Sequence, residues 1–306
     1  MEKRKTHVDN AKIVSRETCN KIGFRVEKSC TLLAFLYERM PEMKKTQVKQ
    51  ILAHEIEVGG RKVSQFDFPL QPGMVVERVK RPYNQRFLPR GLDIIYEDAH
   101  LLVVNKHEGL LSYSLKPNET TVISELNRYL EHRHEQVHAH IVHRLDRDTS
   151  GLMVVSKSKI VSRKFEEDWK KRVYDRAYVA VAWGVVNPVE GVVTSWLTDG
   201  PFCVLSSPID NGGKKAVTHY KLLKENGRFS LLELHLDTGR RNQIRVHLRE
   251  MKHPVVHDPM YGYKEDTAPI HRLALHAFRL CFIHPITGEK KEFSTPVPPS
   301  FLRLVE

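Results

Sequence analysis

The stretch HRLDRDTSGLM, residues 143–153, organises the interpretation of this sequence. It lies between the runs QVHAHIV and VVSK, whose β-branched residues predict two buried strands around a polar loop. Turn-forming side chains bond nearby backbone groups, so Asp148 is expected to stabilise the turn. Asp146 stands between Arg144 and Arg147, and neighbouring positive charge favours an ionised carboxylate. Asp146 is therefore the candidate for a nucleophile or a base.

A structural ion pair is the alternative interpretation of an aspartate among arginines. The longer string favours chemistry, because HRLDRDTSGL resembles, almost letter for letter, the signature of the RluA-type RNA pseudouridine synthase family. In that family the aspartate of the HRLD segment is the essential catalytic residue. The resemblance assigns this role to Asp146. It also implies that Arg144 fills the gap left by a flipped nucleotide or contacts a phosphate, and that Arg147 lies near the RNA.

Composition indicates a polyanionic partner. The chain has 306 residues, with 49 Lys and Arg against 37 Asp and Glu, which gives a formal net charge of +12. Such a balance favours nucleic acid, with an anionic membrane surface as the rival. Because no apolar run approaches 18 residues and no hydrophobic segment follows the charged N-terminus, we expect a soluble, cytoplasmic protein without a membrane span.

Neither the cysteines nor the histidines predict a metal site. The four cysteines are scattered without a Cys-x-x-Cys spacing, so no zinc knuckle or disulfide framework is expected. Five of the 17 histidines crowd residues 132–143, yet no acidic or cysteine partner stands at a recognised metal-site interval. We expect no metal, and we interpret these histidines as loop residues facing solvent or RNA.

Four segments are predicted along the chain. Residues 1–24 are polar and aperiodic, which is typical of a flexible basic arm, and residues 83–92 form a proline-bearing linker. Between them, residues 25–82 predict two helices followed by short strands, with a Gly59-Gly60 hairpin. Residues 93–306 form the second and larger domain. Each domain is long enough to have its own core.

The segment 25–82 resembles the small S4 RNA-binding domain. The resemblance rests on a Leu-Leu-x-Phe-Leu start, a basic second helix, a hairpin glycine and a Pro-Gly before the last strand. It implies RNA contacts from the second helix, and Lys45 and Lys49 are the candidates. A helical pair that carries surface lysines and binds nothing is the alternative.

Further motifs of the synthase family follow in order. Tyr178, in the strand RAYVAV, corresponds to the active-site tyrosine, which would lie against the uracil and assist proton removal from C5. The run TGRRNQIRVHL matches a family segment at Arg240, Gln243 and Arg245, but Arg241 and Asn242 depart from it, since Thr and His are usual there. Arg245 is the expected partner of the catalytic aspartate.

The closing motifs complete the resemblance. HPVVHDPMYG, residues 253–262, matches the family except that His257 replaces a glycine, so a local change is expected if that glycine had a positive φ. Leu273 or Leu275 would supply the apolar contact beneath the target base. The implied fold is α+β, with a mixed, largely antiparallel sheet preceded by the small S4-like module.

The resemblance implies conversion of uridine to pseudouridine in ribosomal or transfer RNA. The N-glycosidic bond breaks and the same uracil rejoins through C5, so no cofactor is expected and no obligatory protein partner is implied. The target nucleotide must be flipped out of its stack. Two rivals remain: a non-catalytic RNA-binding or ribosome-assembly protein, and a metal-dependent nuclease that uses the histidine cluster.

Overall fold

The computed structural model describes residues 20–80, 88–116, 118–133 and 135–306. The chain divides into two compact units, Met1–Arg86 and Phe87–Glu306, each with an apolar core of its own. Residues 1–19 of the expected arm and 83–87 of the expected linker lie outside the described residues. No helix in the described ranges is long and apolar enough to cross a membrane.

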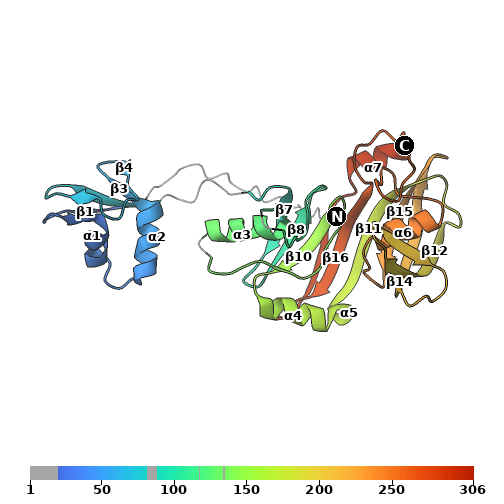
Figure 1. Cartoon of the computed structure of the whole chain (residues 1–306), viewed down its shortest axis with the longest axis horizontal. Coiled ribbons are helices and arrows are strands. Elements are labelled where there is room, and N and C mark those ends of the chain that lie inside the picture. Colours follow the sequence, from blue (N-terminus) through green and yellow to red (C-terminus); the bar gives the residue numbers. More distant parts are fainter. Residues whose placement is uncertain (1–19, 81–87, 117, 134) are drawn as a thin grey trace, which may run out of the picture. The chain divides into compact units, whose positions relative to one another are not determined.

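The first unit packs two helices against a four-stranded sheet of order β1-β6-β3-β4 (Figure 1). The predicted apolar face of α2 is buried through Val48, Ile51 and Leu52, while Lys45 and Lys49 are exposed. The elements are β1 (Asn20–Arg25), β2 (Cys30–Thr31), α1 (Leu32–Arg39), α2 (Lys45–Glu55), β3 (Ile56–Val58), β4 (Arg61–Lys62), β5 (Pro69–Leu70) and β6 (Val75–Lys80).

Strand β1 falls partly inside the segment expected to be a flexible arm. It pairs antiparallel with β6, from Asn20 opposite Lys80 to Arg25 opposite Val75, so the arm prediction is wrong for residues 20–24. Only two apolar residues alternate in this stretch, and charged residues flank them. The two-residue period of a strand is therefore hard to recognise there. The hairpin prediction is confirmed, because Gly59 and Gly60 have φ values of 57° and 79° and join β3 to β4.

The second unit is built on an 11-stranded sheet of order β13-β12-β14-β15-β11-β16-β10-β8-β7, with β17 paired to β16 and β9 to β10. Its strand pairs are antiparallel except β10 with β16, so the predicted mixed, largely antiparallel fold is confirmed. The strands are β7 (Leu92–Glu97), β8 (Leu101–Lys106), β9 (His140–Ile141), β10 (Ser150–Ser156), β11 (Val173–Trp183), β12 (Glu190–Asp199), β13 (Val204–Ser207), β14 (Lys214–Glu225), β15 (Phe229–Leu236), β16 (Leu275–Ile283) and β17 (Lys290–Ser294).

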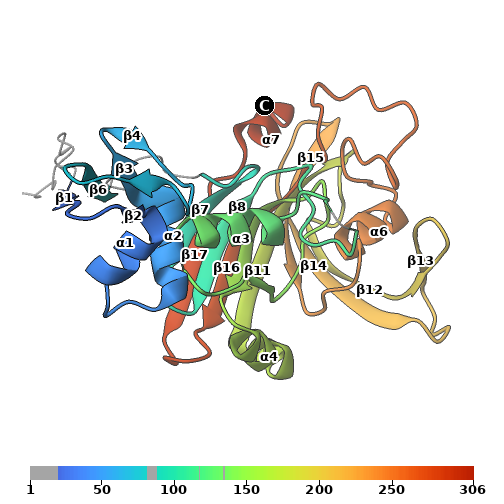
Figure 2. The same ribbon diagram turned by 60° about the vertical axis from the view of Figure 1, so that its left-hand side comes forward.

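Helices cover both faces of this sheet, which explains why β8 and β10 are apolar almost throughout. Successive strand residues point to opposite faces, and here each face has a helix to bury them. The helices are α3 (Val122–His132), α4 (Lys159–Glu167), α5 (Trp169–Arg172), α6 (Gln243–Glu250) and α7 (Pro299–Leu304). Leu102, Val104, Met153 and Val155 pack with α3 on one face, and Leu101, Val103, Leu152 and Val154 pack with α4 on the other. Figure 2 shows α3 in front of this part of the sheet.

Gly151 allows the close approach of β10 to β16. It has a φ of 119°, and a Cβ atom there would lie 2.2 Å from the carbonyl oxygen of Ala277. Only glycine fits this position. The close approach brings the loop that precedes β10 next to the strands that carry the other predicted site residues.

Candidate active site

The loop that carries Asp146 runs between β9 and β10 and is held by its backbone on both sides. Ser112 donates its hydroxyl to the carbonyl oxygen of Leu145 at 2.7 Å and accepts the Leu145 N–H at 3.1 Å. Lys106 donates its ammonium to the carbonyl oxygen of Arg147 at 2.8 Å. The Asp146 side chain therefore projects from a backbone whose neighbouring carbonyl groups are fixed.

Lys106 is fully buried, yet its hydrogen-bonding capacity is used. Besides Arg147, it donates to the carbonyl oxygens of His107 and Leu110 at 2.9 and 2.8 Å. Burial lowers the pKa of Lys106 to about 8. The ammonium therefore remains charged at neutral pH and ties the loop after β8 to the Asp146 loop.

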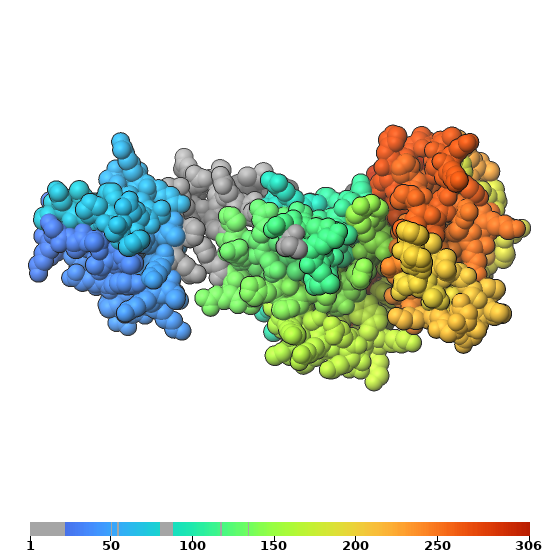
Figure 3. Space-filling model, in the orientation of Figure 1, coloured from blue at the N-terminus to red at the C-terminus, as the bar shows by residue number. Residues whose placement is uncertain are grey.

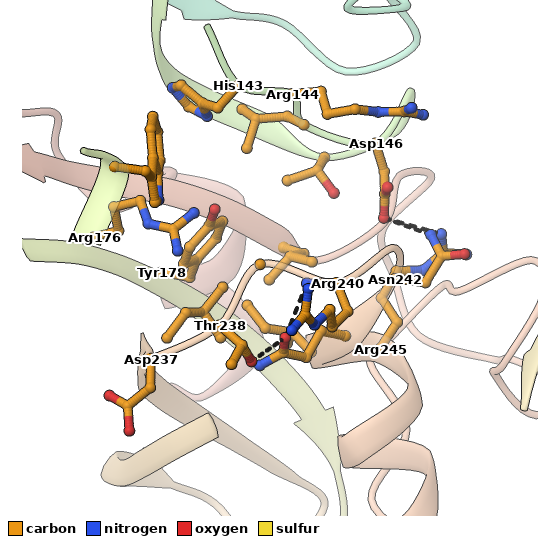
Figure 4. A pocket seen from close by; sticks show the side chains of 18 of the residues that line it. His143, Arg144, Asp146, Arg176, Tyr178, Asp237, Thr238, Arg240, Asn242 and Arg245 are labelled. Carbon is orange, nitrogen blue, oxygen red and sulfur yellow. Dashed lines mark hydrogen bonds and ion pairs between the residues drawn. The ribbon is translucent and has the colours of Figure 1, made fainter. Parts of the chain in front are cut away.

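The Asp146 carboxylate has one oxygen bonded and one free (Figure 4). Oδ2 accepts the Asn242 Nδ2–H at 2.6 Å and lies 3.5 Å from Nη1 of Arg245. Oδ1 has no hydrogen-bond partner among the residues that the structure describes. Since 24% of the side chain is exposed, the free oxygen is available to a substrate.

Arg245 contacts Asp146, as expected, but its main partner is Asp258. The guanidinium donates from Nε and Nη2 to the two oxygens of Asp258, each at 2.7 Å, in a buried fork. Burial alone would lower the pKa of Arg245, but the hydrogen bonds and charge of Asp258, with the charge of Asp146, raise it overall. Arg245 is thus a fixed cation that Asp258 aims and that Asp146 shares.

A cavity of about 380 Å³ opens beside Asp146, within the usual size range of ligand sites. Five lysine and arginine side chains and two aspartates line it, so it suits an anionic ligand. It brings together seven of the residues predicted from the sequence: Arg144, Asp146, Tyr178, Arg240, Gln243, Arg245 and Leu275.

Four predicted residues lie elsewhere. Arg147 is exposed, pairs with Asp148 at 3.0 Å and is not among the lining residues. Leu273 is 2% exposed and belongs to the core of the second unit rather than to the cavity wall. Lys45 and Lys49 belong to the first unit.

Gln243 lines the cavity, but its amide is used within the protein. Its Oε1 accepts the Arg240 N–H at 3.0 Å and the Thr238 hydroxyl at 2.7 Å. Its Nε2 donates to the Val217 carbonyl and the Thr218 hydroxyl, each at 2.9 Å. Gln243 therefore shapes the turn before α6 that presents Arg240.

Tyr178 points into the cavity from β11, where it lies opposite Leu234 of β15 and Ala277 of β16 (Figure 4). Burial raises its pKa, with a further contribution from the charge of Asp146. Its hydroxyl has no hydrogen-bond partner among the described residues. The phenol is therefore neutral and free to meet a ligand.

Arg176 and Trp169 also line the cavity, although neither is among the site residues predicted from the sequence. The Arg176 guanidinium lies over the Trp169 ring at 5.2 Å from its centroid, a cation–π contact. Side chains two apart on a strand share a face, so Tyr178 could have identified Arg176. The helical spacing of Trp169 predicts a core residue, and it does pack in the core while also lining the cavity.

His257, which stands where the family has a glycine, has a left-handed backbone conformation. Its φ is 56°, a conformation that glycine favours. Its N–H donates to Asp266 at 2.6 Å, which stabilises the turn.

The known proteins that this chain resembles are RNA pseudouridine synthases. A family model described as RNA pseudouridylate synthase matches residues 100–250. The ribosomal large subunit pseudouridine synthase D of Neisseria meningitidis serogroup B is 34% identical over 94% of this chain and 82% of its own length. An uncharacterized RNA pseudouridine synthase of Bacillus subtilis is 33% identical over 92% of this chain and 94% of its own.

The solved structure of human RNA pseudouridylate synthase domain containing 1 has a similar fold. It is 27% identical to this chain and aligns with a TM-score of 0.57 over 70% of it and 87% of the human chain. The aligned fold and the sequence relatives therefore agree.

Proposed function

Because this chain belongs to the RNA pseudouridine synthase family, we propose that it isomerises uridine to pseudouridine in large-subunit ribosomal RNA, with Asp146 as its catalytic residue. The names of two relatives, 34% and 33% identical to this chain, support the ribosomal substrate. One observation of the structure carries the assignment of the residue: the Asp146 carboxylate keeps one oxygen free at the wall of a cavity rich in arginine.

Asp146 acts on the ribose of the flipped nucleotide. The free oxygen attacks C1′ as a nucleophile or removes the proton from C2′ as a base; both roles require the ionised carboxylate. Arg245 stabilises that ionised form by its charge. The N1–C1′ bond breaks and the uracil leaves with the bonding electrons, turns within the cavity and bonds to C1′ through C5. Asp146 is then released from C1′, or returns its proton to C2′. C5 loses its proton to solvent, and N1 takes one up.

Tyr178 packs against the uracil as a neutral phenol. Its raised pKa disfavours the phenolate, so we assign it stacking and hydrogen-bond donation rather than removal of the C5 proton. Leu275, which is 3% exposed and lines the same cavity, supplies an apolar surface for the base.

Arg144, Arg176 and Arg240 contact the phosphates around the target nucleotide. All three line the cavity, and none has an ion pair with a described carboxylate. Unpaired guanidinium groups are suited to bind phosphate oxygens. Arg144 is exposed and can also occupy the space that the flipped nucleotide leaves.

Mapping of pseudouridines in total RNA tests the substrate. Cells that lack the gene should lose pseudouridine at sites in large-subunit ribosomal RNA, and the wild-type gene, but not Asp146→Asn, should restore them. Loss confined to transfer RNA would overturn the ribosomal assignment. Restoration by Asp146→Asn would overturn the catalytic one. Product formation that persists in chelator would discard the metal-dependent rival.

The first unit adds RNA affinity through the exposed Lys45 and Lys49 of α2. The full-length Lys45→Ala/Lys49→Ala variant should bind RNA more weakly, and log affinity should fall less steeply with log salt, by roughly 0.7 for each phosphate of a single strand that is no longer neutralised. Lys28→Ala/Lys62→Ala, which removes two exposed lysines outside α2, is the matched control. An unchanged slope in the α2 variant would remove these lysines from the interface.

A further inference from the structure

Asn242 stands at a position where the synthase family usually has His, and its backbone is unusual. It precedes α6 with φ 53° and ψ 18°, in the left-handed region, which asparagine tolerates better than most residues. Its side chain does not cap the helix. Instead the amide reaches across to the Asp146 loop, 96 residues earlier in the sequence.

A chain of hydrogen bonds fixes the orientation of that amide. The Val204 N–H donates to the Tyr261 hydroxyl at 2.9 Å, and this hydroxyl donates to Oδ1 of Asn242 at 3.3 Å. A backbone N–H can only donate, so the Tyr261 proton is directed to Asn242. The NH₂ group of Asn242 then faces Oδ2 of Asp146 at 2.6 Å.

The supporting segments are buried where they meet. Val204 and Tyr261 are 4% and 7% exposed and belong to one apolar cluster. In the space-filling view the gold segment around residue 205 adjoins the orange segment of residues 250–270 (Figure 3). The amide of Asn242 is therefore held by packed structure rather than by solvent.

Arg245 does not hold Asp146 in this way. Its Nε and Nη2 are engaged by Asp258 at 2.7 Å, and its Nη1 lies 3.5 Å from Asp146. At that distance the contact of Arg245 with Asp146 is mainly electrostatic, whereas the short hydrogen bond from Asn242 fixes the orientation of the carboxylate.

We propose that Asn242 is a positioning residue for the pseudouridine synthase reaction, which it serves by holding Oδ2 of Asp146 so that Oδ1 faces the ribose. The inference rests on the proposed catalytic role of Asp146. The relay from Val204 through Tyr261 keeps the Asn242 donor aimed at the carboxylate. Catalysis requires such orientation, because a small misplacement of a reacting group costs a large factor in rate.

Asn242→Gly tests the inference, because glycine accepts the left-handed backbone without strain but removes the amide. We expect the single-turnover rate at saturating enzyme to fall at least about tenfold, while RNA affinity and the melting temperature change little. A role confined to the backbone turn would leave this rate unchanged. Asn242→His, which restores a ring N–H donor, should recover most of the rate.

Tyr261→Phe tests the relay. It should lower the single-turnover rate by a smaller factor, and adding it to Asn242→Gly should cause no further loss, since coupled residues are not additive. Tyr263→Phe, whose exposed hydroxyl donates to the Lys252 carbonyl, is the matched control and should keep the wild-type rate.

The outcomes separate this inference from the proposed function. Wild-type rates in Asn242→Gly, together with an inactive Asp146→Asn, would overturn the positioning role alone. Activity in Asp146→Asn would overturn the catalytic assignment itself. If Asn242→Gly does not fold, Tyr261→Phe decides, and a wild-type rate in that variant would overturn the inference.

Discussion

Two loops bring an aspartate to the same guanidinium, and their surroundings are opposite. In the Asp258 loop, residues 257–262, both carboxylate oxygens are bonded and the side chain is fully buried. In the Asp146 loop, residues 143–149, one oxygen is bonded and the side chain remains partly exposed. A buried polar group that is fully satisfied stabilises structure, whereas one with spare capacity beside a cavity is suited to chemistry.

The largest expected effect comes from a substitution in the Asp146 loop. Asp146→Asn keeps the shape of the side chain but removes the charge, so turnover should fall about 10³-fold or more while RNA affinity changes little. Tritium release from labelled uridine measures turnover. Retained turnover would mean that Asp146 is a structural residue like Asp258.

The second largest expected effect is a loss of stability, and it comes from a substitution in the Asp258 loop. Asp258→Asn removes the main counter-ion of the buried Arg245, which should lower the free energy of unfolding by about 3–5 kcal/mol. Urea denaturation measures this change. Asp210→Asn, at an exposed turn, is the control and should change stability by less than about 0.5 kcal/mol. Equal effects at the two positions would contradict the contrast between the loops.

Substitution of Arg245, the cation that both aspartates contact, should lower the catalytic rate less than Asp146→Asn does. Arg245→Lys keeps the charge but loses the planar fork, so activity should fall at least about tenfold, or about 1.4 kcal/mol in the barrier. Arg249→Lys, on the exposed side of the same helix, should keep near-normal rates. Near-normal rates for Arg245→Lys would show that neither aspartate needs the fork.

The smallest effect concerns the turn that begins the Asp258 loop. His257 has a φ of 56°, a conformation that costs a residue with a Cβ atom about 1 kcal/mol or more. His257→Gly should therefore be about 1 kcal/mol more stable to urea than His257→Ala, which keeps the strain. Equal stability of the two variants would show that the turn tolerates a Cβ atom without cost.

Local pattern predicted the elements of the fold well, because burial imposes a period on the sequence. The alternation in β11 and β15 and the helical spacing in α2 identify these elements directly. The sheet order follows no local pattern. Pairing of β10 with β16 joins residues 126 positions apart, from Ser150 to His276.

The placement of Asp146 beside Arg245 was predictable, because it depends on one residue type at one position; the catalytic role of Asp146 stays a prediction. The site was not predictable where partners are shared across loops. Sequence resemblance predicted Arg245 as the partner of Asp146 and gave no sign that Asp258 takes most of that guanidinium. Asn242 looked like a mere departure from the family pattern, since its interaction with Asp146 depends on a left-handed backbone and on Tyr261.

The position of strand β16 in the sequence has a consequence for folding during synthesis. It lies between β11, which carries Tyr178, and β10, which follows the Asp146 loop, yet it begins only at Leu275. Chains emerge from the ribosome N-terminus first. A nascent chain can therefore form the first unit before the second, but it cannot bring Asp146 and Tyr178 into register before β16 is made. Activity therefore requires the synthesis of β16, which follows the part that we propose binds RNA.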